Sequence, residues 1–224
     1  MTEWKLFRET PPETPVMLAG RGWMRLEGQP GFAERAGQVA GLAALAAALK
    51  PGVATVTELG CGDGALLARM PSWLTGWGYE LGAGDVKMAR SRGLDVRQAD
   101  ILADDLEYGD LLIVSEVLEH LADPHKFLLS LPDRLLIASS PSGETGDWHN
   151  PVHAWAWDTD GFRALLGDAG WRVLYQCEFD GGWNSFSGIE GRQRFQAAVA
   201  VRAAAPVAAA AAVKPAARGW GGAP

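Results

Sequence analysis

The stretch that decides the fold is TVTELGCGDG, residues 55–64. It is a β-branched run that ends in an acidic residue and continues into glycines at alternate positions. This pattern predicts a buried strand that runs into a tight turn. Glycine has no Cβ, so the backbone of such a turn can approach a ligand at contact distance.

The spacing of the glycines separates two classes of ligand. A dinucleotide-binding turn has the pattern G-x-G-x-x-G and places a pyrophosphate on the N-terminus of the next helix. Gly60, Gly62 and Gly64 follow G-x-G-x-G instead, and the carboxylate of Asp63 would repel a phosphate. The helix expected over residues 65–70 would point its free N–H groups at the ligand. The turn therefore predicts a ligand without phosphate.

Length and composition limit the class of protein. A chain of 224 residues that is 48% hydrophobic can form one well-buried core, and a net charge of −7 argues against nucleic acid as a partner. The two cysteines, Cys61 and Cys177, match neither a disulfide framework nor a zinc site, which predicts a reducing, cytoplasmic location. The start of the chain does not resemble a signal peptide and no apolar run is long enough to span a membrane, so we expect no membrane association.

Expected strands and helices alternate along the chain, which predicts a parallel sheet with helices on both faces. The first five expected strands are residues 54–58, 76–80, 94–97, 110–115 and 135–139, and the expected helices are 30–50, 65–70, 84–92, 123–131 and 159–169. The last two expected strands, 171–179 and 195–202, have no helix between them and should pair as an antiparallel hairpin. The prediction is an α/β fold with a doubly wound, mostly parallel seven-stranded sheet.

Composition also predicts the domain organisation. Residues 1–50 form an N-terminal arm and a capping helix, and residues 51–202 form the ligand-binding domain. Residues 203–224 are rich in alanine and proline with little to bury, which predicts a disordered tail.

The segment ELGCGDG, residues 58–64, resembles the first motif of the class I S-adenosylmethionine-dependent methyltransferases. The resemblance covers about residues 52–202 and implies a Rossmann-like fold with S-adenosylmethionine as the methyl donor. It also implies that Glu58 lies near the amino group of the methionine part. Gly60, Cys61 and Gly62 would offer backbone groups to that part, and Gly64 completes the turn.

Further cofactor-binding residues are expected at the ends of the following strands. Glu80 lies about 20 positions beyond the start of the motif, where an acidic side chain can accept hydrogen bonds from both ribose hydroxyls. The resemblance implies that Asp100 accepts the exocyclic amine of adenine and that Ile101 packs against the ring. Ser115, at the end of the fourth expected strand, completes the predicted set.

The segment SEVLEHLADP, residues 115–124, resembles a stretch common in small-molecule methyltransferases. If it is helical, Glu116, Glu119 and His120 lie on one face. That face would point at the carboxyl ends of the strands, where open α/β sheets bind ligands.

Two interpretations of this segment remain open. In one, Glu116, Glu119, His120 and His153 bind a divalent cation that positions vicinal hydroxyls of the substrate. Small-RNA 3′-terminal 2′-O-methyltransferases use such a pattern, and residues 153–159 are similar to part of their sequence. In the other no metal is bound, because the same pattern occurs in many relatives without one, and the acidic composition weighs against an RNA substrate. The candidate catalytic residues are then His149, His153 and His120, because the pKa of histidine suits a general base.

The predicted function is therefore S-adenosylmethionine-dependent methylation of an oxygen or nitrogen of a small-molecule acceptor. The alternatives are a metal-assisted 2′-O-methyltransferase of RNA or nucleotide ends, and a cofactor-binding partner subunit without catalysis. The sequence leaves the acceptor and the oligomeric state open.

Overall fold

The structure, a computed structural model, describes residues 5–6, 30–144, 153–186 and 189–203. For residues 5–6, 30–32, 182–186 and 189–193 it describes the backbone alone. Most of the predicted N-terminal arm and nearly all of the predicted tail lie outside the described residues.

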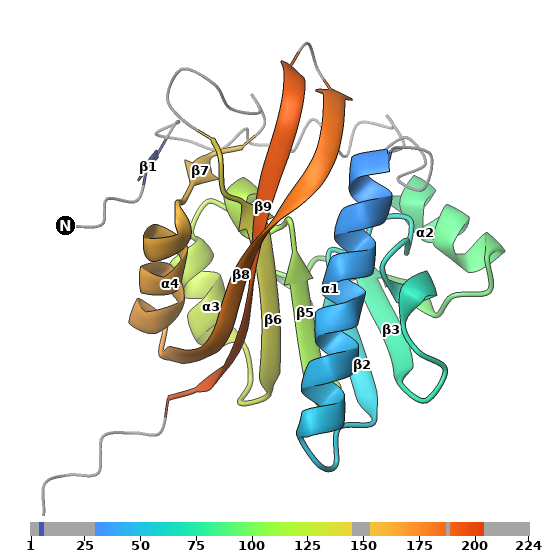
Figure 1. The fold of residues 1–224 in the computed structure, drawn as a ribbon. Coiled ribbons are helices and arrows are strands. Elements are labelled where there is room, and N and C mark those ends of the chain that lie inside the picture. The colour runs from blue at the N-terminus through green and yellow to red at the C-terminus, as the bar shows by residue number, and fades with distance from the viewer. Residues whose placement is uncertain (1–4, 7–29, 145–152, 187–188, 204–224) are drawn as a thin grey trace, which may run out of the picture.

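A seven-stranded sheet in the order β4-β3-β2-β5-β6-β9-β8 forms the centre of the molecule (Figure 1). The strands from β4 to β6 in this order are parallel, and β9 is antiparallel to both of its neighbours. The bounds are β2 (Thr55–Leu59), β3 (Thr75–Glu80), β4 (Val96–Gln98), β5 (Leu111–Ser115), β6 (Leu135–Pro141), β8 (Trp171–Phe186) and β9 (Ile189–Arg202). The predicted fold class, with its C-terminal antiparallel hairpin, is confirmed.

The hairpin is longer than the sequence predicts. Residues 180–194 were expected to form a loop, but β8 and β9 stay paired through Phe186 and Ile189, with an irregularity between Asp180 and Trp183. Because Phe195 of β9 pairs with Pro141, the last residue of β6, the part of the hairpin before Phe195 projects beyond the carboxyl ends of the parallel strands (Figure 1). A second sheet pairs β1 (Lys5–Leu6) with β7 (Trp155–Ala156).

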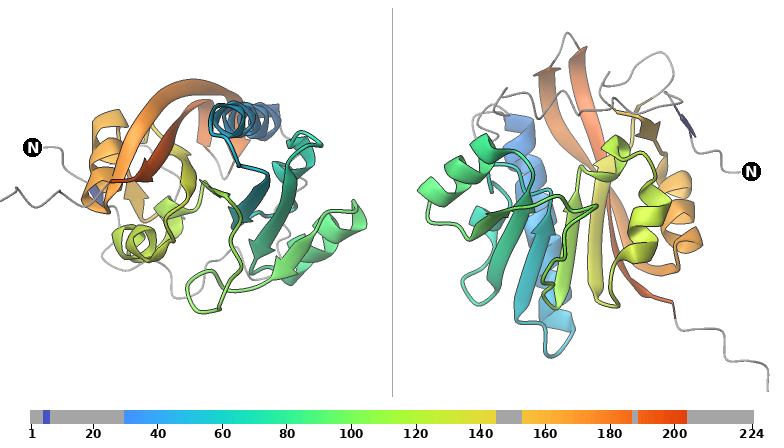
Figure 2. Two further views of the ribbon diagram at one scale, coloured as in Figure 1. Left: turned by 90° about the horizontal axis from the view of Figure 1, so that it is seen from below. Right: turned by 180° about the vertical axis from the view of Figure 1, so that it is seen from behind.

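Helices cover both faces of the main sheet (Figure 2). Leu111 and Ile113 of β5 pack in one cluster with residues of α1, and Leu112 and Val114 pack in another with residues of α3 and α4. A strand that is buried on both faces reads as a continuous apolar run, which is how β5 appears in the sequence. The helices are α1 (Pro30–Leu49), α2 (Ala83–Ser91), α3 (Pro124–Ser130) and α4 (Thr159–Asp168).

The helix predicted over residues 65–70 is wrong. This segment forms only the short 3-10 turn η3 (Leu67–Arg69), after which Met70 has an extended backbone. Met70 precedes Pro71, and a residue before proline is sterically driven out of the α conformation. The glycine turn is therefore followed by a single 3-10 turn and not by the N-terminus of an α-helix.

None of the helices in the described part of the chain is both long and apolar enough to cross a lipid bilayer.

Candidate functional site

The glycine turn lies at the carboxyl end of β2, as the sequence predicts. Gly60 and Gly64 have φ angles of 74° and 79°, in the region that favours glycine. A Cβ on Gly60 would lie 2.6 Å from Cγ2 of Val117, and one on Gly64 would lie 2.4 Å from Cδ1 of Leu94. Both backbone angle and space therefore require glycine at these positions.

Glu80 ties this turn to the end of β3. The N–H of Gly62 donates to Oε2 of Glu80 (2.9 Å), and the N–H of Gly82 donates to Oε1 (2.8 Å). Each carboxylate oxygen has a further lone pair, so the same carboxylate can still accept hydrogen bonds from a ligand. The carboxylate is thus held in place beside the turn before any ligand binds.

Two acidic side chains of the motif point into the protein. Glu58 is buried, and burial raises the pKa of its carboxyl well above the usual value, although the charge of Arg35 opposes this shift. Asp63 is fully buried and forms an ion pair with Arg92 (3.2 Å). The guanidinium of Arg92 therefore compensates the charge of Asp63, so this carboxylate repels a phosphate less than the sequence suggests.

The remaining predicted cofactor residues follow the ends of other strands. Oδ1 of Asp100 accepts a hydrogen bond from the N–H of Leu102 (2.8 Å), and Ile101 packs against the main core cluster. Oγ of Ser115 lies 2.8 Å from Oγ of Ser139. The thiol of Cys61 is buried, and burial raises its pKa well above the usual value, which is opposite to what a nucleophile needs.

Residues 116–120, for which the sequence left a helix open, do not form an α-helix. Glu116 has a φ of 58°, and its N–H donates to the carbonyl of Ser139 (3.1 Å). Only the 3-10 turn η4 (Leu118–His120) follows, and α3 begins at Pro124 with Asp123 as its N-cap. Asp123 precedes proline and is kept out of the α conformation, so one continuous helix cannot form.

Glu116 belongs to a polar group that includes Arg35, which sequence reasoning missed. Its Oε2 lies 3.4 Å from the guanidinium of Arg35 in α1, and its Oε1 accepts a hydrogen bond from Ser139 (2.9 Å). Burial raises the pKa of Glu116, while the charge of Arg35 opposes this shift. Arg35 shares the buried face of α1 with Val39 and Ala43, so the four-residue spacing was a usable signal.

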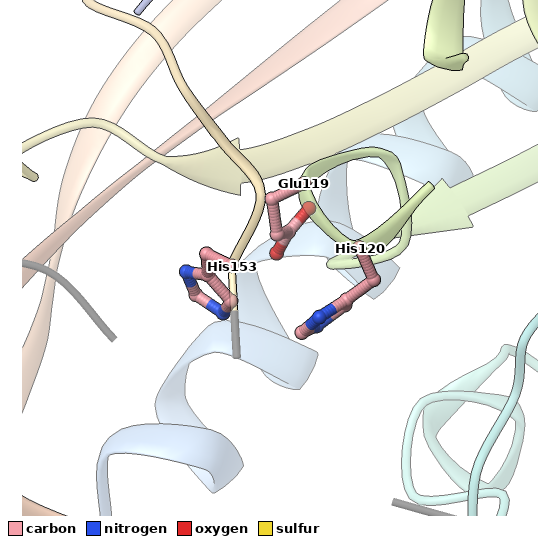
Figure 3. Close-up of side chains that lie close together, drawn as sticks. All are labelled: Glu119, His120 and His153. Carbon is pink, nitrogen blue, oxygen red and sulfur yellow. The ribbon is translucent and has the colours of Figure 1, made fainter. Parts of the chain in front are cut away.

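Glu119, His120 and His153 lie together at the carboxyl end of the sheet (Figure 3). One ligand atom from each lies within 4.8 Å of the others. The two imidazole rings meet edge to face at 4.6 Å between centroids. The N–H of Ala154 donates to the carbonyl of Glu119 (2.8 Å), which holds His153 beside η4.

The buried carboxylate of Glu144, which the sequence did not reveal, orients His153. Nδ1 of His153 lies 2.9 and 2.8 Å from the two oxygens of Glu144. Glu144 lies in the loop after β6, where no periodic pattern marks it as buried. Of the four predicted metal ligands, the structure therefore gathers three, while Glu116 is engaged by Arg35 and Ser139. His149 lies outside the described residues.

Comparisons with known proteins agree with the fold described above. A family model described as methionine biosynthesis protein MetW, a class I methyltransferase-like family, matches residues 40–142, which include the glycine turn and strands β2 to β6. The chain has the fold of the class I S-adenosylmethionine-dependent methyltransferases. The predicted resemblance is thereby confirmed. No curated protein matches the sequence significantly.

Several solved structures share this methyltransferase fold. The magnesium protoporphyrin IX methyltransferase of Synechocystis PCC 6803 with bound S-adenosylmethionine is 20% identical, with a TM-score of 0.55 over 83% of this chain and 94% of that chain. The N-methyltransferase NodS of Bradyrhizobium japonicum, in complex with S-adenosyl-L-homocysteine, is 18% identical, with a TM-score of 0.59 over 82% and 94%. The [4+2]-cyclase SpnF is 16% identical, with a TM-score of 0.55 over 75% and 81%. A cyclase among them shows that this fold alone does not determine the reaction.

Proposed function

We propose that this protein transfers a methyl group from S-adenosylmethionine to an oxygen or nitrogen of a small-molecule acceptor. The observation that carries the proposal is the carboxylate of Glu80, which the N–H groups of Gly62 and Gly82 hold beside the glycine turn. Structural neighbours with S-adenosylmethionine or S-adenosylhomocysteine bound support the same ligand class.

The residues at the turn match the chemistry of this cofactor. Glu80 would accept hydrogen bonds from the ribose hydroxyls, and Gly60, Cys61 and Gly62 would face the methionine part. Among the described residues, no donor reaches Oε2 of the buried Glu58. A ligand ammonium group nearby would satisfy this oxygen, directly or through water. Asp100 and Ile101 would take the adenine, with Ser115 and Gly64 completing the site.

Methyl transfer is an in-line displacement at a positively charged sulfonium centre, so positioning provides most of the acceleration. For a hydroxyl acceptor a general base is also useful, and His120, His149 and His153 are the candidates. The contact of Nδ1 of His153 with Glu144 favours the tautomer in which Nε2 carries the lone pair. In the protein without a bound metal ion, His153 would then accept the proton of the acceptor through Nε2.

Replacing Gly62 with arginine tests the cofactor site. We expect Gly62→Arg to weaken binding of S-adenosylmethionine by about 100-fold or more in calorimetry, because the side chain would fill the space beside Glu80 and the turn. Gly52→Arg is the matched control. Gly52 also has a positive φ, of 89°, and a Cβ added there would meet no atom within 4 Å, but it precedes β2 at the opposite end of that strand.

The control variant should bind as the wild type does. Equal affinity of the Gly62→Arg variant and the wild type would contradict the assignment of the turn. Transfer of labelled methyl groups to a fraction of small-molecule extract then tests catalysis. Tight cofactor binding without transfer to any acceptor would favour the alternative of a partner subunit without catalysis.

A second candidate function is metal-assisted 2′-O-methylation of RNA or nucleotide ends. The cluster of Glu119, His120 and His153 favours it, because a bound cation could draw vicinal hydroxyls into place. The net charge of −7 opposes a long nucleic acid and leaves short nucleotide ends as the acceptor to test. Full activity on all acceptors after chelation of divalent ions would exclude this candidate.

A further inference from the structure

We propose that Glu119, His120 and His153 bind one divalent transition-metal ion of the zinc type. The ion goes beyond the proposed methylation of a small molecule, which needs no metal, and it is the ion that the second candidate function would use. The donor set combines two imidazoles with one carboxylate, which zinc and its neighbours in the first transition series accept. Calcium and magnesium prefer oxygen ligands alone, so this set disfavours them.

The distances between the ligand atoms of the three side chains are close to those that a bound ion would require. The ligand atoms lie within 4.8 Å of one another, whereas two donors about 2.1 Å from one ion lie at most about 4.2 Å apart. A small rotation of the side chains would close this difference. The backbone bond from Ala154 to Glu119 and the bond from Nε1 of Trp155 to the carbonyl of Leu121 (2.9 Å) already hold the two segments together.

Glu119 provides an independent indication of a ligand. Its side chain is fully buried, and within the described residues neither carboxylate oxygen accepts a hydrogen bond of good geometry, while the acidic side chain of Glu116 lies beside it. Figure 3 shows this carboxylate pointing toward the space between the two imidazole rings. Burying an unpartnered carboxylate is costly, and a bound cation would remove that cost.

A metal-binding histidine normally donates its other ring N–H to a carboxylate or a carbonyl, and Glu144 is in the right place to accept this bond from His153. The carboxylate of Glu144 lies against Nδ1, which leaves Nε2 to coordinate the ion and fixes the orientation of the ring. Arg35 and Ser139 hold Glu116 outside the ligand set. Three protein ligands leave coordination positions open for water or for an oxygen of the acceptor.

Titration of metal-stripped protein with Zn²⁺, followed by calorimetry, tests the site, and the absorption spectrum of added Co²⁺ reports the geometry. We expect one ion per chain in the wild type. Glu119→Gln should weaken binding about 100-fold, and Glu144→Gln about 10–100-fold, as for loss of an outer-shell partner. His125→Asn is the matched control, because His125 lies on α3 outside the cluster.

Affinity for S-adenosylmethionine, measured on the same samples, shows that each variant is folded and keeps the test separate from the proposed function. Absence of Zn²⁺ and Co²⁺ uptake by the wild type would overturn the proposal. Equal uptake by wild type and Glu119→Gln would also overturn it, since the ion would then bind elsewhere. If Zn²⁺ binds as expected but the cofactor does not, the metal site stands and the proposed function fails.

Discussion

Asp85 shows how the glycine turn affects a neighbouring residue. It lies in the first turn of α2 and is buried, and burial raises the pKa of its carboxyl to about 6, with the charges of Glu80 and Asp63 adding to the shift. A carboxyl whose pKa is higher in the folded state binds more protons there than in the unfolded chain. The stability contributed by the protonated form is therefore lost as the pH rises from about 4 to about 6.

We expect Asp85→Asn to remove this loss, because the amide has no charge to bury. The measurement is the melting temperature of the variant minus that of the wild type, both without cofactor. This difference should increase between pH 4 and pH 7 and stay constant above pH 7. Asp105→Asn is the control for removal of one exposed carboxylate. A difference for Asp85→Asn that does not depend on pH would contradict this prediction.

Single residues were predictable from the sequence where one local constraint identifies them. Gly60 and Gly64 follow from the turn, and Glu80 follows from its position after the next strand. Arg35 lies against Glu116, 81 residues further along the chain, and Glu144 lies against His153, nine residues further along. No local rule connects such pairs, so the structure was needed to reveal them.

At the scale of elements, Asp110 aligns the starts of β2 and β5. Its Oδ2 accepts hydrogen bonds from the N–H groups of Ala54 (3.1 Å) and Thr55 (3.0 Å) and from Oγ1 of Thr55 (2.6 Å). These bonds, led by the one from the Thr55 hydroxyl, lower the pKa of the Asp110 carboxyl. Their stabilising effect is present above the ordinary pKa of aspartate and is lost as the pH falls through the lowered value.

We expect Asp110→Ala to lower the free energy of unfolding by about 1–3 kcal/mol at pH 7, since two backbone N–H groups and a hydroxyl lose a charged acceptor. The loss should shrink at acidic pH. A double-mutant cycle with Thr55→Val, followed by urea unfolding, should give a coupling energy of about 0.5–3 kcal/mol. Additive effects of the two changes would show that the contact contributes nothing.

The elements themselves were predicted well where an apolar stretch is bounded by turn residues, as in α1, which ends before Pro51 and Gly52, and in the parallel strands. The one wrong helix, residues 65–70, directly precedes Pro71, and steric exclusion at Met70 outweighed helix propensity there. The hairpin was predicted too short because residues 180–194 are rich in glycine and polar side chains. Pairing between the two strands continues through them regardless.

At the scale of the whole molecule, Arg202 joins the last strand to two helices. Its guanidinium donates to the carbonyl oxygens of Leu128 (3.1 Å), Leu129 (3.0 Å), Leu131 and Ala169 (2.9 Å). It also lies 4.2 Å from the ring centroid of Trp171. One side chain thus satisfies carbonyl groups at the ends of both α3 and α4.

Replacing Arg202 with alanine should lower the free energy of unfolding by about 3 kcal/mol, because several carbonyl groups, most of them part-buried, lose a charged donor. Arg202→Lys should recover only part of this loss, since an ammonium group cannot reproduce the planar fork of the guanidinium. Urea unfolding of both variants measures the effect, with Arg172→Ala, an exposed arginine on β8, as the control. Full recovery by lysine would contradict a role for the fork geometry.

The topology was predictable because alternating strands and helices allow few arrangements. The sequence did not reveal which strand of the hairpin joins β6. Either strand could pair there, since both carry apolar side chains at alternate positions. The structure places β9, the last strand, between β6 and β8.

This order has a consequence for synthesis on the ribosome. The edge of β6 stays uncovered until residues 189–202 have left the exit tunnel, although every parallel strand has emerged well before. An unpaired edge is a template for pairing with another chain, and translation adds only about 5–20 residues per second. A nascent chain that stalls after β8 would therefore expose the unpaired edge of β6, in the middle of the sheet, to neighbouring polypeptides. Chaperones would encounter the chain in that state.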